Sequence, residues 1–247
     1  MHALITLSHG SRHPRAKAGI QELTNAAAAR LGVPSADAHL EFNEPTLAGA
    51  ARDLAEAGVR RAVVVPLLYT RAFHATVDVP EAVAAASEFL DITLAEGLGT
   101  GEDVARVLEL RVLIDAPVHS HIVLYPVGTS NLEQARAYEA LARDLARRCG
   151  RGVDGVSVVA ATRGGVDALT EVARAHEAVH VLPLFTTHGT LLDKAVDALP
   201  AIAAETGARM SCSGPLSTKL ASVVADRYTA ALAPRPTHPS QPVKESN

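Results

Sequence analysis

The stretch LITLSHGS at residues 4–11 decides the fold, because it returns as IVLYPVGT at residues 122–129. Two more pairs of stretches repeat in the same order along the chain: VVPLLYT (64–70) with VLPLFTT (181–187), and LGT (98–100) with LST (216–218). The separation between partners stays at 117 or 118 residues throughout. A register that holds over this length indicates an internal duplication, which gives two copies of one small unit.

Each copy alternates short apolar runs with helical patterns. The predicted strands are 3–7, 36–42, 62–68 and 92–95 in the first copy, and 121–126, 155–161, 179–185 and 209–212 in the second. The predicted helices include 15–31, 46–57, 76–89, 102–112 and 132–148. Continuous apolar runs are typical of parallel strands that are covered on both faces. We therefore predict an α/β fold of two tandem flavodoxin-like domains, each with a four-stranded parallel sheet in the order 2-1-3-4.

The length of 247 residues is sufficient for two domains of ordinary size. We place the first domain, which carries the predicted site, at residues 1–113. The second, degenerate copy is placed at 120–232, after a linker that contains Pro117. The tail at 233–247 holds four prolines and many polar residues, so we expect it to be disordered.

The composition excludes several classes of protein. Hydrophobic residues make up 48% and charged residues 20% of the chain, which is typical of a globular protein. The net charge of −4 argues against a nucleic-acid-binding surface, so an anionic substrate would need local cations. Cys149 and Cys212 lie far apart and form no metal-cluster motif. The start of the chain has neither a signal-peptide pattern nor a membrane span, so we expect a cytoplasmic protein with no membrane partner.

Two histidines stand at the ends of predicted strands in the first copy only. His9 directly follows the first strand, and His74 lies in the stretch FHATVDVP at 73–80, after the third. The matching positions of the second copy are Val127 and Leu191. Because both histidines are replaced by aliphatic residues together, we predict a single working site, in the first copy.

The predicted strand order brings these histidines together. Strands one and three are neighbours, so His9 and His74 should face each other across a cleft at the carboxyl edge of the sheet. Glu41 leaves strand two beside them. Two imidazoles and a carboxylate suit a divalent metal such as iron, cobalt, nickel or zinc. Instead of taking part in the site, Glu41 could cap a helix or be solvated. For His188 and Asp193 of the second copy we expect a structural or surface role.

Cations near this cleft could bind an acidic ligand. They are Arg12, Arg15, Lys17 and Arg71, with His13 beside them. Alternatively, the residues at 12–17 form the first turn of a helix and are simply exposed to solvent. The sequence alone does not decide between ligand binding and solvent exposure for these residues.

The stretches LSHGSR at 7–12 and FHATVDVP at 73–80, with Glu41 between them, resemble the sirohydrochlorin chelatases of the class II chelatase family. The first half of the chain carries the motifs, and the second half is similar in its pattern of elements, as in the long, two-domain, CbiX/SirB-like members. The resemblance implies a chelatase-like fold with its site in the cleft. It also implies that His9 and His74 bind a metal and assist its insertion into a modified tetrapyrrole, without nucleotide hydrolysis.

The predicted function is therefore a lyase that inserts Fe²⁺ or Co²⁺, as a substrate, into sirohydrochlorin in sirohaem or cobalamin biosynthesis. Insertion releases two pyrrole protons, which a neutral imidazole can accept near neutral pH. His9, His74 and Glu41 are the predicted catalytic residues, with both histidines as metal ligands and Glu41 as orienter or base. The predicted substrate-binding residues are Ser8, Gly10, Ser11, Arg12, Arg15 and Arg71. We expect no organic cofactor, and a monomer, because a duplicated chain supplies its own pairing.

Two other functions use some of the same residues. A carrier of metal or tetrapyrrole would need the same histidines, and only turnover separates it from an enzyme. The pair Arg12-His13 also suggests the R-H-G motif of histidine phosphatases, but here Pro14 follows, and the histidine at the strand end is His9. The residues do not select the metal, and we favour iron, with cobalt close behind.

Overall fold

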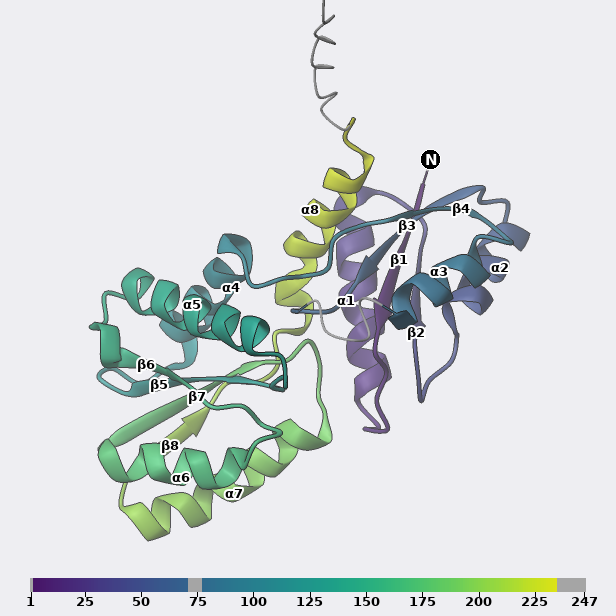
Figure 1. The fold of residues 1–247 in the computed structure, drawn as a ribbon. Helices are drawn as coiled ribbons and strands as arrows, with labels where there is room; N and C mark the ends of the chain where they lie inside the picture. Colours follow the sequence, from purple (N-terminus) through teal and green to yellow (C-terminus); the bar gives the residue numbers. More distant parts are fainter. Residues whose placement is uncertain (1, 71–76, 235–247) are drawn as a thin grey trace, which may run out of the picture.

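The fold consists of two parallel sheets, each covered by helices, in a computed structural model that describes residues 2–70 and 77–234 (Figure 1). The sheets have the orders β2-β1-β3-β4 and β6-β5-β7-β8. The strands are β1 (Ala3–Ser8), β2 (Ser35–His39), β3 (Arg61–Pro66), β4 (Asp91–Leu94), β5 (His121–Pro126), β6 (Val156–Val158), β7 (Ala178–Leu184) and β8 (Arg209–Cys212). The predicted α/β duplication and the strand order are confirmed.

The central strands are apolar along their whole length because both faces are covered. Every residue of β1, β5 and β7 is buried. In the first sheet Leu4 pairs with Val63 of β3, and Leu7 with Pro66. The edge strands β4 and β8 are only partly buried. This pattern places the carboxyl ends of β1 and β3 side by side, as the sequence predicts.

Eight α-helices surround the sheets in the described ranges. They are α1 (Ala16–Leu31), α2 (Leu47–Glu56), α3 (Val79–Ala86), α4 (Glu102–Asp115), α5 (Leu132–Arg148), α6 (Gly165–Ala175), α7 (Thr190–Thr206) and α8 (Ala221–Leu232). The short 3-10 turns η2 (Val153–Gly155) and η3 (Ser217–Leu220) complete the chain. Helices α2 and α3 cover one face of the first sheet, and α6 and α7 cover one face of the second.

The last helix of each copy crosses to the other sheet. Helix α4 follows β4 of the first sheet, yet it packs on α5 and β7 of the second. Helix α8 follows β8 of the second sheet, yet it packs on α1, β3 and β4 of the first (Figure 1). We call the first sheet with α1, α2, α3 and α8 the first lobe, and the second sheet with α4, α5, α6 and α7 the second lobe. The predicted boundaries 1–113 and 120–232 describe the sequence repeat, and these lobes cut across them.

Side chains of α8 fix the segment that leads from β4 to α4, where the chain crosses from the first lobe to the second. The guanidinium of Arg227 in α8 donates to the carbonyls of Gly97, at 2.9 Å, and Leu98, at 2.7 Å. It also lies 2.7 Å from the Asp103 carboxylate at the start of α4. The hydroxyl of Tyr228 donates to the carbonyl of His2 at 2.7 Å. In addition, a continuous apolar core joins the two lobes through α1, α4, α5 and α8. The predicted disordered tail lies almost wholly outside the described residues.

Candidate functional site

The carboxyl ends of both sheets open into one cleft between the lobes, with a volume of about 1170 Å³. The first lobe lines it with residues 8–12 after β1 and 67–70 after β3. The second lobe lines it with the matching loops, 127–131 and 184–191. The cleft thus lies where parallel α/β sheets bind their ligands.

Gly10 fixes the loop that carries His9. Its φ is +93°, and a Cβ at this position would lie 1.8 Å from the carbonyl oxygen of Glu41. The backbone N–H of Glu41 donates to the His9 carbonyl at 2.9 Å, so the segment after β2 lies directly over the loop. Only glycine allows this approach. The backbone therefore presents the His9 ring, half-buried, to the cleft.

The structure describes one of the two predicted metal ligands. His9 lines the cleft, whereas His74 and Arg71 lie outside the described residues. Within the described ranges, no group of three or more His, Cys, Asp or Glu side chains is arranged to hold a metal ion. The pairing of His9 with His74 therefore stays a prediction.

The other predicted residues separate into those that line the cleft and those that do not. Ser8, Gly10, Ser11 and Arg12 line it. The Glu41 side chain is exposed and is not part of the lining, although its backbone contacts His9. Arg15 points across the lobes, 3.7 Å from Asp193. Its predicted role in substrate binding has no support in this arrangement.

His13 and the second-copy residues form a contact between the lobes. The Nε2 atom of His13, which is buried, lies 2.6 Å from the Asp193 carboxylate. Its ring stacks on His188 with a centroid distance of 6.0 Å. Burial, followed by the nearby Arg15 charge, lowers the pKa of His188. This contact agrees with a structural role for Asp193, while His188 also lines the cleft.

Phe42, which no sequence motif singled out, lies at the mouth of the cleft. Its side chain is 51% exposed and its φ is +62°, an unfavourable conformation for a bulky residue. The guanidinium of Arg12 lies 4.8 Å above the ring centroid, and the His9 ring meets it edge-on at 6.0 Å. Strained residues of this kind cluster at ligand sites. The sequence could not indicate a role at the cleft for Phe42, because it is a single aromatic residue at the end of the segment 36–42, which was predicted as a strand.

A chain of three buried polar residues, which no sequence motif singled out, begins at Ser8, directly before His9. The hydroxyl of Ser8 lies 2.7 Å from Nδ1 of His39, and Nε2 of His39 lies 3.3 Å from the Asp37 carboxylate. All three residues are buried, and both Ser8 and His39 reach the cleft lining. The contact with His39 is the main cause that lowers the pKa of Asp37. The signal in the sequence was the spacing of Asp37 and His39, which puts both on one face of β2.

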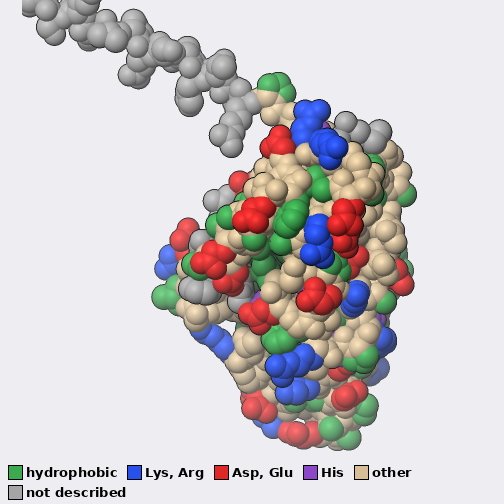
Figure 2. All heavy atoms as spheres, turned by 90° about the vertical axis from the view of Figure 1, so that its right-hand side faces the viewer, with side chains coloured by type: hydrophobic (Ala, Val, Ile, Leu, Met, Phe, Trp, Pro, Cys, Tyr) green, Lys and Arg blue, Asp and Glu red, His purple; other side chains and the backbone are tan. Residues whose placement is uncertain are grey.

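Charge in the cleft has one sign among the described residues. Arg12 and Lys17 line it together with three histidines, and no carboxylate does. Figure 2 shows acidic and basic side chains interspersed over another face of the molecule. Apolar side chains such as Leu68 and Phe185, together with uncharged polar ones such as Asn43 and Thr186, form the rest of the wall. A cleft of this kind suits a flat, largely apolar ligand with anionic groups at its edge.

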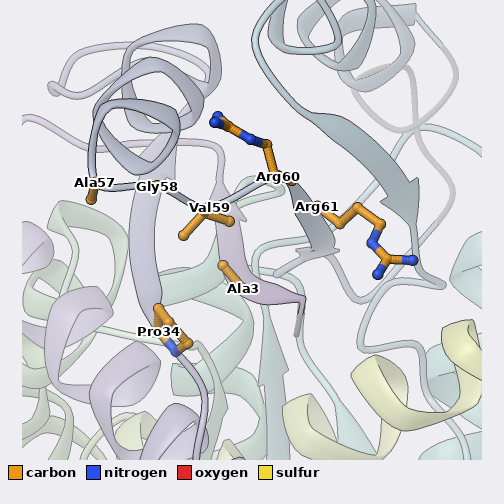
Figure 3. A pocket seen from close by; sticks show the side chains of 7 residues that line it. All are labelled: Ala3, Pro34, Ala57, Gly58, Val59, Arg60 and Arg61. Atoms are coloured by element: carbon orange, nitrogen blue, oxygen red, sulfur yellow. The ribbon is translucent and has the colours of Figure 1, made fainter.

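A second hollow, of about 360 Å³, lies at the opposite edge of the first sheet. Ala3, Pro34 and the loop at 57–61 form it (Figure 3). The side chains of Arg60 and Arg61 point in different directions in Figure 3 and do not converge on a common point. This hollow therefore has no site geometry.

The fold and the cleft together define a two-lobed α/β protein of the chelatase-like class. Residues 3–114 match the CbiX family, so the predicted resemblance is confirmed for the first copy. The chain is 36% identical over 81 residues, 32% of its length, to the sirohydrochlorin cobaltochelatase of Methanocaldococcus jannaschii. It is 28% identical over 149 residues, 58% of its length, to the sirohydrochlorin ferrochelatase of Bacillus subtilis. The matched segments span 57% of each relative.

The solved structure of SirB from Bacillus subtilis with Fe³⁺ has the same fold. It superposes with a TM-score of 0.75 over 94% of this chain and 96% of that one, at 23% identity. The likeness thus extends over both copies of the repeat, including the second, which the family match does not reach. None of the helices in the described part of the chain is long and apolar enough to cross a membrane.

Proposed function

We propose that the protein is a sirohydrochlorin chelatase, which inserts Fe²⁺ or Co²⁺ into sirohydrochlorin without nucleotide hydrolysis. The observation that carries this proposal is the cleft, in which Gly10 presents His9 between an apolar wall and a fringe of cations. The match to the CbiX family and the likeness to two sirohydrochlorin chelatases support it.

The residues fit the chemistry of the substrate. The macrocycle carries carboxylates at its edge, which Arg12 and Lys17 would bind, and a flat face, which would stack on Phe42 and the apolar wall. His9, with His74 as the second predicted ligand, would hold the incoming metal. We assign to Arg71 a further contact with the substrate carboxylates. Glu41 would turn toward the cleft to orient a histidine or to accept a proton.

We also propose an oligomeric state, a cellular location and a pathway for the enzyme. We infer a monomer, because the two lobes in one chain enclose the cleft without a second subunit. A cytoplasmic location is consistent with the two free cysteines, Cys149 and Cys212. The pathway follows from the metal, with sirohaem from iron and a cobalamin precursor from cobalt.

The test is anaerobic insertion of Fe²⁺ and of Co²⁺, followed by absorbance with sirohydrochlorin in large excess over protein. We expect many turnovers above the uncatalysed rate, and a loss of at least about 100-fold in His9→Ala, since a metal ligand is removed. His119→Ala, at an exposed position on the linker, should keep the parent rate. A rate in His9→Ala equal to that of the parent would refute the proposed site. Conversion that stops at one equivalent would favour the carrier.

A further inference from the structure

The face of the first sheet that lies under α1 carries polar residues that a buried face normally excludes. Ser8 and His39 pair across β1 and β2, as do Thr6 and Asp37. His39 is only 2% exposed, and its two ring nitrogens face the Ser8 hydroxyl and the Asp37 carboxylate. Burying polar groups costs free energy unless they are fully hydrogen-bonded, so an apolar side chain is the usual choice on such a face.

The second copy shows that the fold does not need these groups. Leu40 donates to the carbonyl of Ser8, and Ala161 donates in the same way to Pro126. This correspondence gives the matching residues: Pro126 for Ser8, Val158 for Asp37 and Ala160 for His39. All three polar residues are thus apolar in the copy that also replaces His9 by Val127. The polar chain is therefore present only in the copy that carries the predicted site, whereas the fold is common to both copies.

The direction of the Ser8–His39 hydrogen bond follows from the charge on Asp37, whose carboxylate lies 3.3 Å from Nε2 of His39. Its contact with His39, opposed by burial and assisted by the charge of Lys17, keeps the pKa of this carboxyl low, so it is ionised. A neutral His39 beside a carboxylate carries its hydrogen on Nε2, which leaves Nδ1 as an acceptor. The Ser8 hydroxyl must then donate to Nδ1. The lone pairs of its oxygen remain available to a donor in the cleft.

Insertion needs a proton acceptor that is not occupied by the metal. A ring nitrogen that coordinates the metal has no lone pair left for a proton, so His9 cannot perform both tasks at one atom. The hydroxyl of Ser8 belongs to the residue directly before His9, and Ser8 lines the same cleft. This places the polar chain where a pyrrole N–H would be deprotonated.

We propose that Ser8, His39 and Asp37 form a proton relay that deprotonates the macrocycle as the metal enters. A pyrrole N–H bond breaks and its proton passes to Oγ of Ser8, while the hydroxyl proton of Ser8 passes to Nδ1 of His39. The electron pair stays on the pyrrole nitrogen, which binds the metal. The Asp37 carboxylate stabilises the resulting imidazolium. The proton then returns through Ser8 to water in the cleft, and the second pyrrole proton follows the same path. The relay rests on the proposed function.

The first test is Asp37→Asn. The amide of asparagine can donate to Nε2 of His39, which moves the ring hydrogen to Nδ1 and turns the hydrogen bond with Ser8 around. We expect kcat to fall by about 100-fold, the size of a lost general base, while KM for sirohydrochlorin and the affinity for Co²⁺ alone stay unchanged. Ser8→Ala should show the same loss. The double variant should be no worse than either single variant, because the residues act as one unit.

Two controls separate a relay from a structural role. Thr6→Val removes the neighbouring Thr6–Thr24 hydrogen bond under α1 and should keep the parent kcat. The triple variant Ser8→Ala, Asp37→Val, His39→Ala makes the first copy resemble the second. It should unfold at the same urea concentration as the parent or a higher one, because an apolar replacement of a whole buried network is often neutral or stabilising. It should nevertheless lose kcat.

The outcomes distinguish the relay from the proposed function. If the unaltered protein inserts metal and folded Asp37→Asn keeps its kcat, the relay is wrong and the chelatase stands. If Ser8→Ala raises KM alone, Ser8 only binds substrate and the relay is again wrong. If the unaltered protein inserts no metal, the proposed function fails, and the relay fails with it.

Discussion

At the residue scale, the site combines a glycine, a histidine and an aromatic ring that depend on each other. Gly10 permits the segment after β2 to lie over the His9 loop, and the same segment carries Phe42 in its left-handed conformation. Phe42 in turn supports the Arg12 guanidinium at 4.8 Å. In the second copy the residue that follows Thr162, the counterpart of Glu41, is Arg163, so the aromatic is absent there as well. The geometry of the cleft is thus set by backbone conformation as much as by side chains.

Replacement of Phe42 by asparagine should separate stability from substrate binding. Asparagine tolerates a positive φ, so Phe42→Asn relieves strain of about 1–2 kcal/mol and loses a cation–π contact of about 0.5–1 kcal/mol. We expect the free energy of unfolding to stay equal or to rise by up to about 1 kcal/mol. KM for sirohydrochlorin should rise roughly tenfold, which corresponds to about 1.4 kcal/mol of lost stacking.

Urea unfolding and steady-state kinetics measure the two effects. Phe89→Asn is the matched control, because this phenylalanine is 42% exposed and lies outside the cleft lining. It should leave KM unchanged. A drop in unfolding free energy of more than about 2 kcal/mol in Phe42→Asn would mean that the ring serves packing and not the substrate.

At the element scale, the exchange of α4 and α8 is what the sequence could not predict. Apolar periodicity predicts a helix with one buried face, and the helix at 102–112, which is α4, was expected on those grounds. The same periodicity does not say which sheet that face covers, because the two sheets are copies with similar surfaces. The end of strand 36–42 was also misplaced: β2 ends at His39, since the chain turns there to place Phe42 at the cleft.

Comparison of the two copies explains which cleft residues the sequence could indicate. His9 was predicted because its counterpart Val127 lies in an obvious repeat, and its role stays a prediction. Asp37 and His39 gave no such signal because β2 and β6 have little sequence similarity, and their register follows only from backbone hydrogen bonds. Arg15 was predicted as a substrate-binding residue; it is the N-cap residue of α1, lies 3.7 Å from Asp193 and is not part of the cleft lining, and its role stays a prediction.

Arg227 should stabilise the segment that leads from β4 to α4. In Arg227→Ala the carbonyls of Gly97 and Leu98 lose a charged donor, and Asp103 loses its ion pair. We expect the free energy of unfolding to fall by about 2–3 kcal/mol, measured by urea titration. Arg106→Ala, which removes an exposed pair with Glu102, serves as the control and should have little effect. If both variants lowered the free energy of unfolding equally, Arg227 would not be what stabilises the segment from β4 to α4.

At the scale of the whole molecule, the exchanged helices make the two lobes a single folding unit. One apolar core runs through α1, α4, α5 and α8, so neither half of the sequence contains all the parts of one lobe. Such a shared core favours one cooperative unfolding transition. It also holds the two walls of the cleft at a fixed spacing, to which the contact between His13 and Asp193 contributes from its edge.

This arrangement predicts which fragment of the chain folds best. Because Leu98 and Leu216 occupy matching positions, residues 1–98 can be joined directly to residues 217–234, which supplies α8 in place of α4. The continuous fragment 1–116 has the same length and is the control. The joined fragment carries Val223, Val224 and Tyr228, all buried in the full protein, so we expect it to be the more stable of the two by several kcal/mol. Urea unfolding followed by circular dichroism compares them. If the continuous fragment were equally stable, α4 would cover either sheet equally well, and the exchange would reflect the connection between the copies and not the fit of the helices.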